Sequence, residues 1–128
     1  MKGFFILTLL ILIYSNLISQ NLQDQVEIRR TSYGVPHIKG QNLKAVSFGL
    51  AYAQFEDRGS KVIEPLLRAK GITAKYVGEE LIERDLYAKL VQELTAKMYG
   101  NLNQETRDIL EGFAAGVNYY LSLHQDEF

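Results

Sequence analysis

The side chains in this sequence that could do chemistry are few and widely separated. Its two histidines, His37 and His124, have no second histidine or carboxylate at the spacing of a metal site. His37 follows a proline in a predicted strand, and a structural histidine bonded to the backbone is favoured there over a catalytic one. His124 follows the last predicted helix, where it would favour the negative end of the helix dipole.

Of three clusters of charged residues, one is a candidate for a site. Glu56-Asp57-Arg58 ends a very apolar predicted helix. It could be a buried ion pair near a site, or a structural pair or solvated turn. The second interpretation is preferred, because buried ion pairs more often fix geometry than do chemistry. The other two clusters, Glu79-Glu80 and Glu83-Arg84-Asp85, are predicted to be solvated.

Familiar nucleophile patterns are missing. The chain of 128 residues has no cysteine, which excludes disulfides, Cys-ligated zinc and a thiol nucleophile within it. It has no Gly-x-Ser-x-Gly elbow, no Ser-x-x-Lys pair and no phosphate loop. We therefore assign no catalytic, cofactor-binding or metal-binding residue to this sequence.

The composition is that of one ordinary globular domain, with 47% hydrophobic and 23% charged residues. The chain has fourteen basic and fifteen acidic residues, and the sequence shows no stripe of basic residues. A nucleic-acid partner therefore has little electrostatic support.

The first 19 residues have the three-part pattern of a secretory signal peptide. A short basic start, Met1-Lys2-Gly3, precedes an apolar run from Phe4 to Tyr14, and a polar, partly small segment follows it. The apolar run of about eleven residues is too short to span a bilayer, although an uncleaved anchor is the alternative. We expect cleavage after Ser19, a periplasmic or secreted product, and a mature chain 20–128 with no membrane span.

The mature chain predicts a short β-hairpin followed mostly by α-helices, which is an α+β pattern. Residues 26–30 alternate apolar and polar side chains, and residues 37–40 form a second short strand after a turn at Tyr33–Pro36. Asn42 caps a helix over 43–58. Apolar residues then predict a helical stretch near 62–67, with Pro65 in its first turn or at a kink and Gly71 as its stop.

Two further helices are predicted beyond a less regular stretch. Leu86, Leu90 and Leu94 repeat every four residues and indicate a helix from about Asp85 to Tyr99. Asn103 caps the last helix. In it Gly112 and Gly116 lie one turn apart, which predicts close packing against another part of the protein.

The helix over 43–58 is apolar around most of its circumference. Leu43, Val46, Leu50 and Ala53 mark one face, and Phe48, Tyr52 and Phe55 mark an adjacent one. These aromatics could line a ligand pocket, but core packing is the preferred interpretation. A helix of this kind is buried inside something larger than this chain. The last residues, Gln125 to Phe128, have no terminating pattern, and we expect a chain cut in mid-course.

Three ordered blocks resemble the penicillin acylase family of N-terminal-nucleophile hydrolases. They are the opening strand and turn, Val26 to Ile38; the helical block Phe48-Gly-Leu-Ala-Tyr-Ala-Gln-Phe-Glu-Asp57; and Gly112-Phe-Ala-Ala-Gly-Val-Asn118. Finer details are similar to the acyl-homoserine-lactone and aculeacin acylases. These details are Arg29-Arg30-Thr31, Arg68-Ala-Lys-Gly71 with Lys75-Tyr76, and Asp85-Leu-Tyr87.

The resemblance implies the N-terminal part of an αββα fold, cut from a longer precursor into an α chain and a β chain. It implies cleavage of an acyl amide, such as a penicillin, an acyl-homoserine lactone or a related N-acyl compound, by the N-terminal Ser of the β chain. Residues 20–128 would then be a partial α chain, inactive alone, whose partners are the β chain and a small acylated amide. Calcium, bound in some members of the family, cannot be assigned to residues here, and no cofactor is expected in this chain.

The alternative is a self-contained exported helical domain that binds a partner or acts as a scaffold, without catalysis. The apolar circumference of the helix over 43–58 argues against it, because roughly 110 residues leave too little chain to cover that surface.

Overall fold

The computed structural model describes residues 21–127, so the predicted signal peptide over 1–19 lies outside the described residues. A short 3-10 turn, Leu22–Gln25, leads into strands β1 (Val26–Arg30) and β2 (Pro36–Gly40). The main helices are α2 (Leu43–Arg58), α3 (Ile63–Ala69), α4 (Ile82–Met98) and α5 (Gln104–Leu123). The predicted α+β pattern of a hairpin followed by helices is confirmed.

The two strands pair antiparallel, with Ile28 opposite Ile38. Their apolar side chains pack on α2, where Gly49 lets them approach closely. A Cβ added at Gly49 would lie 2.6 Å from Cγ2 of Val26 and 2.8 Å from Cγ2 of Ile38. The missing side chain at Gly49 therefore sets how closely the hairpin and α2 can pack.

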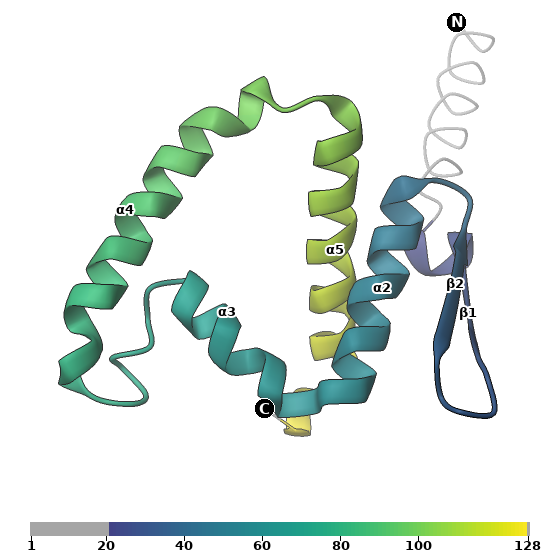
Figure 1. Ribbon diagram of the computed structural model, residues 1–128, viewed down its shortest axis with the longest axis horizontal. Coiled ribbons are helices and arrows are strands. Elements are labelled where there is room, and N and C mark those ends of the chain that lie inside the picture. Colours follow the sequence, from purple (N-terminus) through teal and green to yellow (C-terminus); the bar gives the residue numbers. More distant parts are fainter. Residues whose placement is uncertain (1–20, 128) are drawn as a thin grey trace, which may run out of the picture.

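Helices α2 and α5 lie side by side and form the core (Figure 1). Two glycines allow this contact. A Cβ added at Gly112 would lie 2.1 Å from the Lys44 carbonyl oxygen, and a Cβ added at Gly116 would lie 2.3 Å from the Phe48 carbonyl oxygen. Both helices start at the predicted caps, because the Asn42 and Asn103 side chains accept backbone N–H bonds of 2.9 and 2.8 Å. The buried cluster between them consists of Ala51, Phe55, Val117 and Tyr120.

Helix α3 ends in a Schellman motif, as the predicted stop at Gly71 requires. The N–H of Gly71 donates to the Arg68 carbonyl and that of Ile72 to the Leu67 carbonyl, while Gly71 has a φ of 61°. Pro65 lies in the first turn of α3, where its missing N–H is tolerated.

Helix α4 begins at Ile82, three residues earlier than predicted, because a 3-10 turn over Glu79–Leu81 runs directly into it. In Figure 1 α4 stands apart from the α2–α5 pair and is reached through α3. Its repeating leucines are therefore open to solvent in this chain; Leu86 is 62% exposed and Leu90 53%. None of the helices in the described part combines the length and hydropathy that a bilayer span requires.

The predicted all-round burial of α2 is only partly observed. Phe48, Ala53 and Phe55 are buried, whereas Leu43 and Leu50 remain more than 40% exposed. Helix α5 and the hairpin flank α2 on two different sides and leave these two leucines open (Figure 1).

Candidate functional site

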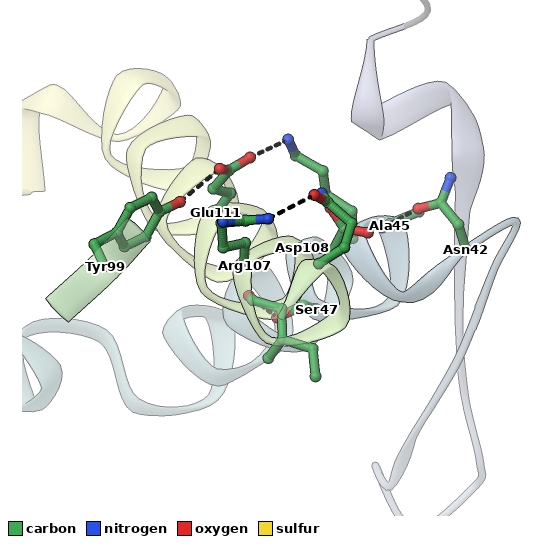
Figure 2. A network of polar contacts seen from close by, with 10 residues as sticks. Asn42, Ala45, Ser47, Tyr99, Arg107, Asp108 and Glu111 are labelled. Atoms are coloured by element: carbon green, nitrogen blue, oxygen red, sulfur yellow. Dashed lines mark hydrogen bonds and ion pairs between the residues drawn. The ribbon is translucent and has the colours of Figure 1, made fainter. Parts of the chain in front are cut away.

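A network of polar side chains joins the first turns of α2 to α5 and to the turn before α5 (Figure 2). The Glu111 carboxylate accepts from Lys44 Nζ at 2.5 Å and from the Tyr99 hydroxyl at 2.6 Å. The hydrogen bond from Lys44, together with the one from Tyr99, lowers the pKa of Glu111. The hydrogen bond from Tyr99 to Glu111 also raises the pKa of Tyr99. At neutral pH the Glu111 carboxyl is therefore ionised and the Tyr99 hydroxyl is protonated. The arrangement fixes geometry; it does not create an acid or a base.

Ser47 makes a second contact between the two helices. Its side chain is buried, and its hydroxyl donates to the Ile109 carbonyl oxygen at 2.6 Å. The hydroxyl is thereby committed to the backbone of α5. Activation as a nucleophile requires a base that takes the proton, and here the proton is held by a backbone carbonyl instead.

We expect Ser47→Ala to lower the free energy of unfolding by about 1 kcal/mol, because a hydrogen bond between two packed helices is lost. Hydrogen exchange of peptides from α2 and α5 in the full-length protein measures it as a local free energy of opening. Ser122→Ala is the matched control, since that hydroxyl bonds within its own helix at an exposed position, to the Tyr119 carbonyl. Equal effects of the two changes would show that the Ser47 contact adds nothing.

Asp85 was predicted to be solvated, and this is wrong. It is 7% exposed, and its Oδ2 accepts from the Ala74 N–H at 2.7 Å. Burial alone raises the pKa of this carboxyl, but hydrogen bonds from the Ala74 and Thr73 backbone outweigh it and hold the pKa below its ordinary value. Asp85 therefore ties the turn after α3 to the first turn of α4. No local pattern in the sequence indicates this contact across eleven residues.

Acid should release this turn. Because the pKa of Asp85 is lower in the folded than in the unfolded protein, its ionised carboxylate stabilises the fold. This stabilisation is present in full above the unfolded pKa of about 4 and is lost as the pH falls through the folded pKa. We expect lower protection, that is, faster hydrogen exchange relative to the intrinsic rate at the same pH, over residues 72–78 below about pH 4. Asp85→Asn should exchange faster at neutral pH and lose the acid-dependent step; an unchanged step in this variant would assign it to another group.

The Glu56-Asp57 cluster is a structural pair, as preferred from the sequence. Arg30, at the end of β1, contacts Glu56 at 2.9 Å and Asp57 at 2.8 Å, and also donates to the Gly34 carbonyl. All three charged side chains are partly exposed. The cluster therefore fastens the hairpin turn to the end of α2.

The histidines lie far apart in the fold. His37 is exposed on β2, opposite Arg29. His124 follows α5; its Nδ1 lies 2.8 Å from the Tyr120 carbonyl oxygen, and its ring stacks on that of Tyr120. Among the described residues, no three His, Asp or Glu side chains gather as a metal-binding group.

The aromatic side chains of α2 belong to the core. The Phe48 ring lies 5.5 Å from Tyr119, and the Tyr52 and Phe55 rings each lie 5.4 Å from Tyr120. Phe48 and Phe55 are buried. Core packing, preferred over an acyl pocket from the sequence, describes their environment here.

An apolar groove lies between the C-terminal half of α4 and the N-terminal half of α5, with a volume of about 720 Å³. Its wall consists of Gln92, Thr95, Ala96, Met98, Tyr99, Leu102 and Leu110. Tyr99 connects this α4–α5 groove to the Glu111 network, because its hydroxyl bonds to Glu111 while its ring lines the groove. The wall of the groove is largely apolar, so the groove suits an apolar occupant and resembles a surface on which another element packs.

Comparison with known proteins places these features in context. Residues 25–128 match the penicillin amidase family. The chain is 32% identical over 114 residues to an acyl-homoserine lactone acylase of Pseudomonas fluorescens, covering 81% of this chain and 15% of that protein. It is 28% identical to the aculeacin-A acylase of Actinoplanes utahensis, covering 73% and 14%.

A solved structure, the thermostable penicillin G acylase from Alcaligenes faecalis, matches with a TM-score of 0.66 and 28% identity. The match covers 79% of this chain and 55% of that one. The chain thus spans about one seventh of the length of the curated relatives named above.

Proposed function

Because this chain belongs to the penicillin amidase family, we propose that it is the N-terminal part of an exported amidohydrolase that cleaves an acyl amide. The nucleophile is the N-terminal Ser of a β chain encoded after residue 128. Residues 20–128 are then a partial α chain, which acts as a scaffold and contributes no catalytic group.

The observation that carries the proposal is the family match over nearly all described residues. Two further features support it. The chain corresponds to about 15% of an acylase relative, and α4 leaves Leu86, Leu90 and Leu94 more than half exposed. Contiguous apolar surface of this kind marks an interface with other protein.

The proposed reaction needs no catalytic group from this chain. A serine hydroxyl is a poor nucleophile until a base takes its proton, and a terminal α-amine has a pKa near neutrality that suits this role. Donors in an oxyanion hole then stabilise the tetrahedral intermediate. Both functions belong to the β chain in this proposal, in agreement with the Ser47 hydroxyl being committed to α5.

The names of the relatives support a substrate class. Proteins named acyl-homoserine lactone acylase, aculeacin-A acylase and penicillin G acylase share an amide bond to an acyl group as their target. We propose a small N-acyl amide for this protein as well. Within the class, two of these relatives favour an acyl-homoserine lactone or a related N-acyl compound over a penicillin.

The test uses the full-length gene product. We expect two chains on a denaturing gel, an α chain beginning near Gln20 after export, and a β chain beginning with Ser. Replacing that Ser by Ala should reduce hydrolysis of an acyl-homoserine lactone and of benzylpenicillin to background, while Ser122→Ala leaves it unchanged. A single uncleaved chain without amidase activity would overturn the proposal.

Export and calcium are separable parts of the same proposal. Residues 1–19 are the leader and the product is periplasmic or secreted. No cofactor is assigned to this chain, and calcium is proposed only for the full-length protein, without assigned ligands. Metal analysis of the purified protein before and after chelation checks the calcium.

A further inference from the structure

We infer that Asp85 is an acid-sensitive clasp, which holds the turn over 70–78 and the first half of α4 together as one unit and releases both when its carboxylate takes up a proton. The inference concerns the conformation of the chain. It goes beyond the proposed function, since it does not depend on catalysis. It also extends the acid effect from the turn to the helix, because the helix is expected to open with the turn.

The end of α3 and the turn after it contact one side of α4 at three places. The Asp85 carboxylate accepts from the Ala74 N–H at 2.7 Å, and the Gln92 side-chain amide donates to the Ala69 carbonyl at the end of α3. Between these bonds Gly71 lies against α4, where an added Cβ would come within 2.6 Å of the Asp85 carbonyl oxygen. Asp85 and Gln92 are about two turns apart, so the contacts run along one side of the first half of α4.

Apolar contacts with the core do not hold α4 in place. In the part of the chain that the structure describes, the core cluster and the side chains packed on it come from α2, α3, α5 and the turn between α2 and α3, and none comes from α4. Leu86, Leu90 and Leu94 lie on a different side of α4 from Asp85 and are more than half exposed. Release of the clasp would therefore free the first half of α4 and leave the α2–α5 core intact.

The surroundings of the carboxylate link its protonation to the opening of the turn. Oδ2 is engaged by the Ala74 N–H, and Oδ1 is shielded from solvent. Thr73, in the turn that folds over the carboxylate, is 1% exposed. A hydrogen bond to an ionised carboxylate is stronger than one to a neutral carboxyl, and here it offsets the cost of burial. A protonated Asp85 loses that compensation, so protonation favours the open form.

The charged groups around Asp85 act in the same direction. Burial raises the pKa of Asp85, but the hydrogen bonds from the turn, together with the neighbouring Arg84, lower it by more. Lys75 in the turn and Lys89 on α4 line a cavity of about 310 Å³, and among the described residues of its wall only Asp85 is acidic. When the pH falls through the folded pKa, the two ammonium groups lose this counter-charge, and their repulsion adds to the opening.

Hydrogen exchange of the full-length gene product, followed by mass spectrometry from about pH 6 to about pH 3, tests the inference. Each rate is divided by the intrinsic rate at the same pH to give a protection factor. We expect the protection of peptides over 67–92 to fall together, by about tenfold, while α2 and α5 keep theirs. Asp85→Asn should show the lower protection already at the higher pH and no further fall. Glu83→Gln, which removes an exposed acid from the same turn of α4, is the matched control and should keep the acid step.

Three results would overturn the inference: a fall confined to residues 72–78, an acid step of equal size in Asp85→Asn, or an equal loss of protection in α2 and α5. Gln92→Leu gives a second reading if Asp85→Asn does not fold. It removes the uncharged contact to Ala69, so it should lower protection over the same residues and keep the acid step. Unchanged protection of α4 in this variant would also contradict the inference. Amidase activity enters none of these measurements, so the proposed function is tested separately.

Discussion

Replacing Gly112 by alanine should push α5 away from α2 and destabilise the core more than the loss of the Ser47 hydroxyl does. The added Cβ would lie 2.1 Å from the Lys44 carbonyl oxygen, which is backbone and cannot rotate aside. Overpacking of this kind costs up to about 3 kcal/mol, and the better helix propensity of alanine returns about 1 kcal/mol, so we expect a net loss of about 2 kcal/mol. Gly116→Ala should behave alike, because its Cβ would meet the Phe48 carbonyl oxygen at 2.3 Å.

The measurement is hydrogen exchange of peptides from α2 and α5 in the full-length protein, which reports the local free energy of opening. Gly100→Ala is the matched control, since its added Cβ would meet no atom within 4 Å. A Gly112→Ala protein whose α5 exchanges as slowly as the unmodified one would show that the two helices do not pack as described.

The second large effect concerns activity. Residues 20–128 produced alone should hydrolyse no acyl amide above background, because the nucleophile and oxyanion donors are proposed to lie in the β chain. The isolated chain should also bind a hydrophobic dye and lack a sharp thermal transition, since Leu86, Leu90, Leu94 and Met98 would be bare.

The control is the complete reading frame, expressed and purified in the same way. Hydrolysis by the isolated chain, free of host enzymes, would overturn the assignment of the site to the β chain. A monomeric isolated chain with a cooperative melt and no dye binding would favour the alternative, a self-contained binding or scaffold domain.

Local signals in the sequence predicted the main strands and helices and several of their ends. Alternation of apolar and polar residues predicted the first strand, and the turn at 33–36 placed the second after it. Asn42 and Asn103 marked two helix starts correctly, because a cap is decided by residues three positions apart. Gly71 marked a stop for the same reason. The start of α4 was missed by three residues, since Leu81 has no side chain able to cap a helix.

Contacts between distant residues could not be predicted in this way. The bond between Lys44 and Glu111 joins residues 67 positions apart, and no pattern in the sequence pairs them. Asp85 was misjudged because charge alone suggests exposure, whereas its burial depends on the turn over 73–74 folding onto α4. The close packing at Gly112 and Gly116 was predicted from their spacing, but the partner helix was not.

The family resemblance was read from three short blocks, and the match over residues 25–128 confirms it. The structure shows what these blocks do in the fold. The first is the hairpin, which packs on α2 at Gly49. The other two supply the facing sides of the α2–α5 contact, where Gly112 and Gly116 admit close neighbours. They are blocks of packing and carry no assigned catalytic group, which is why the site itself could not be derived from them.

The nucleotide sequence downstream of codon 128 in the source genome tests the central claim most directly, namely that the cover and the nucleophile for this scaffold are encoded farther along the same gene. We predict an open frame that continues for several hundred codons and encodes a Ser at the start of the β chain. A stop codon immediately after Phe128 would contradict the claim.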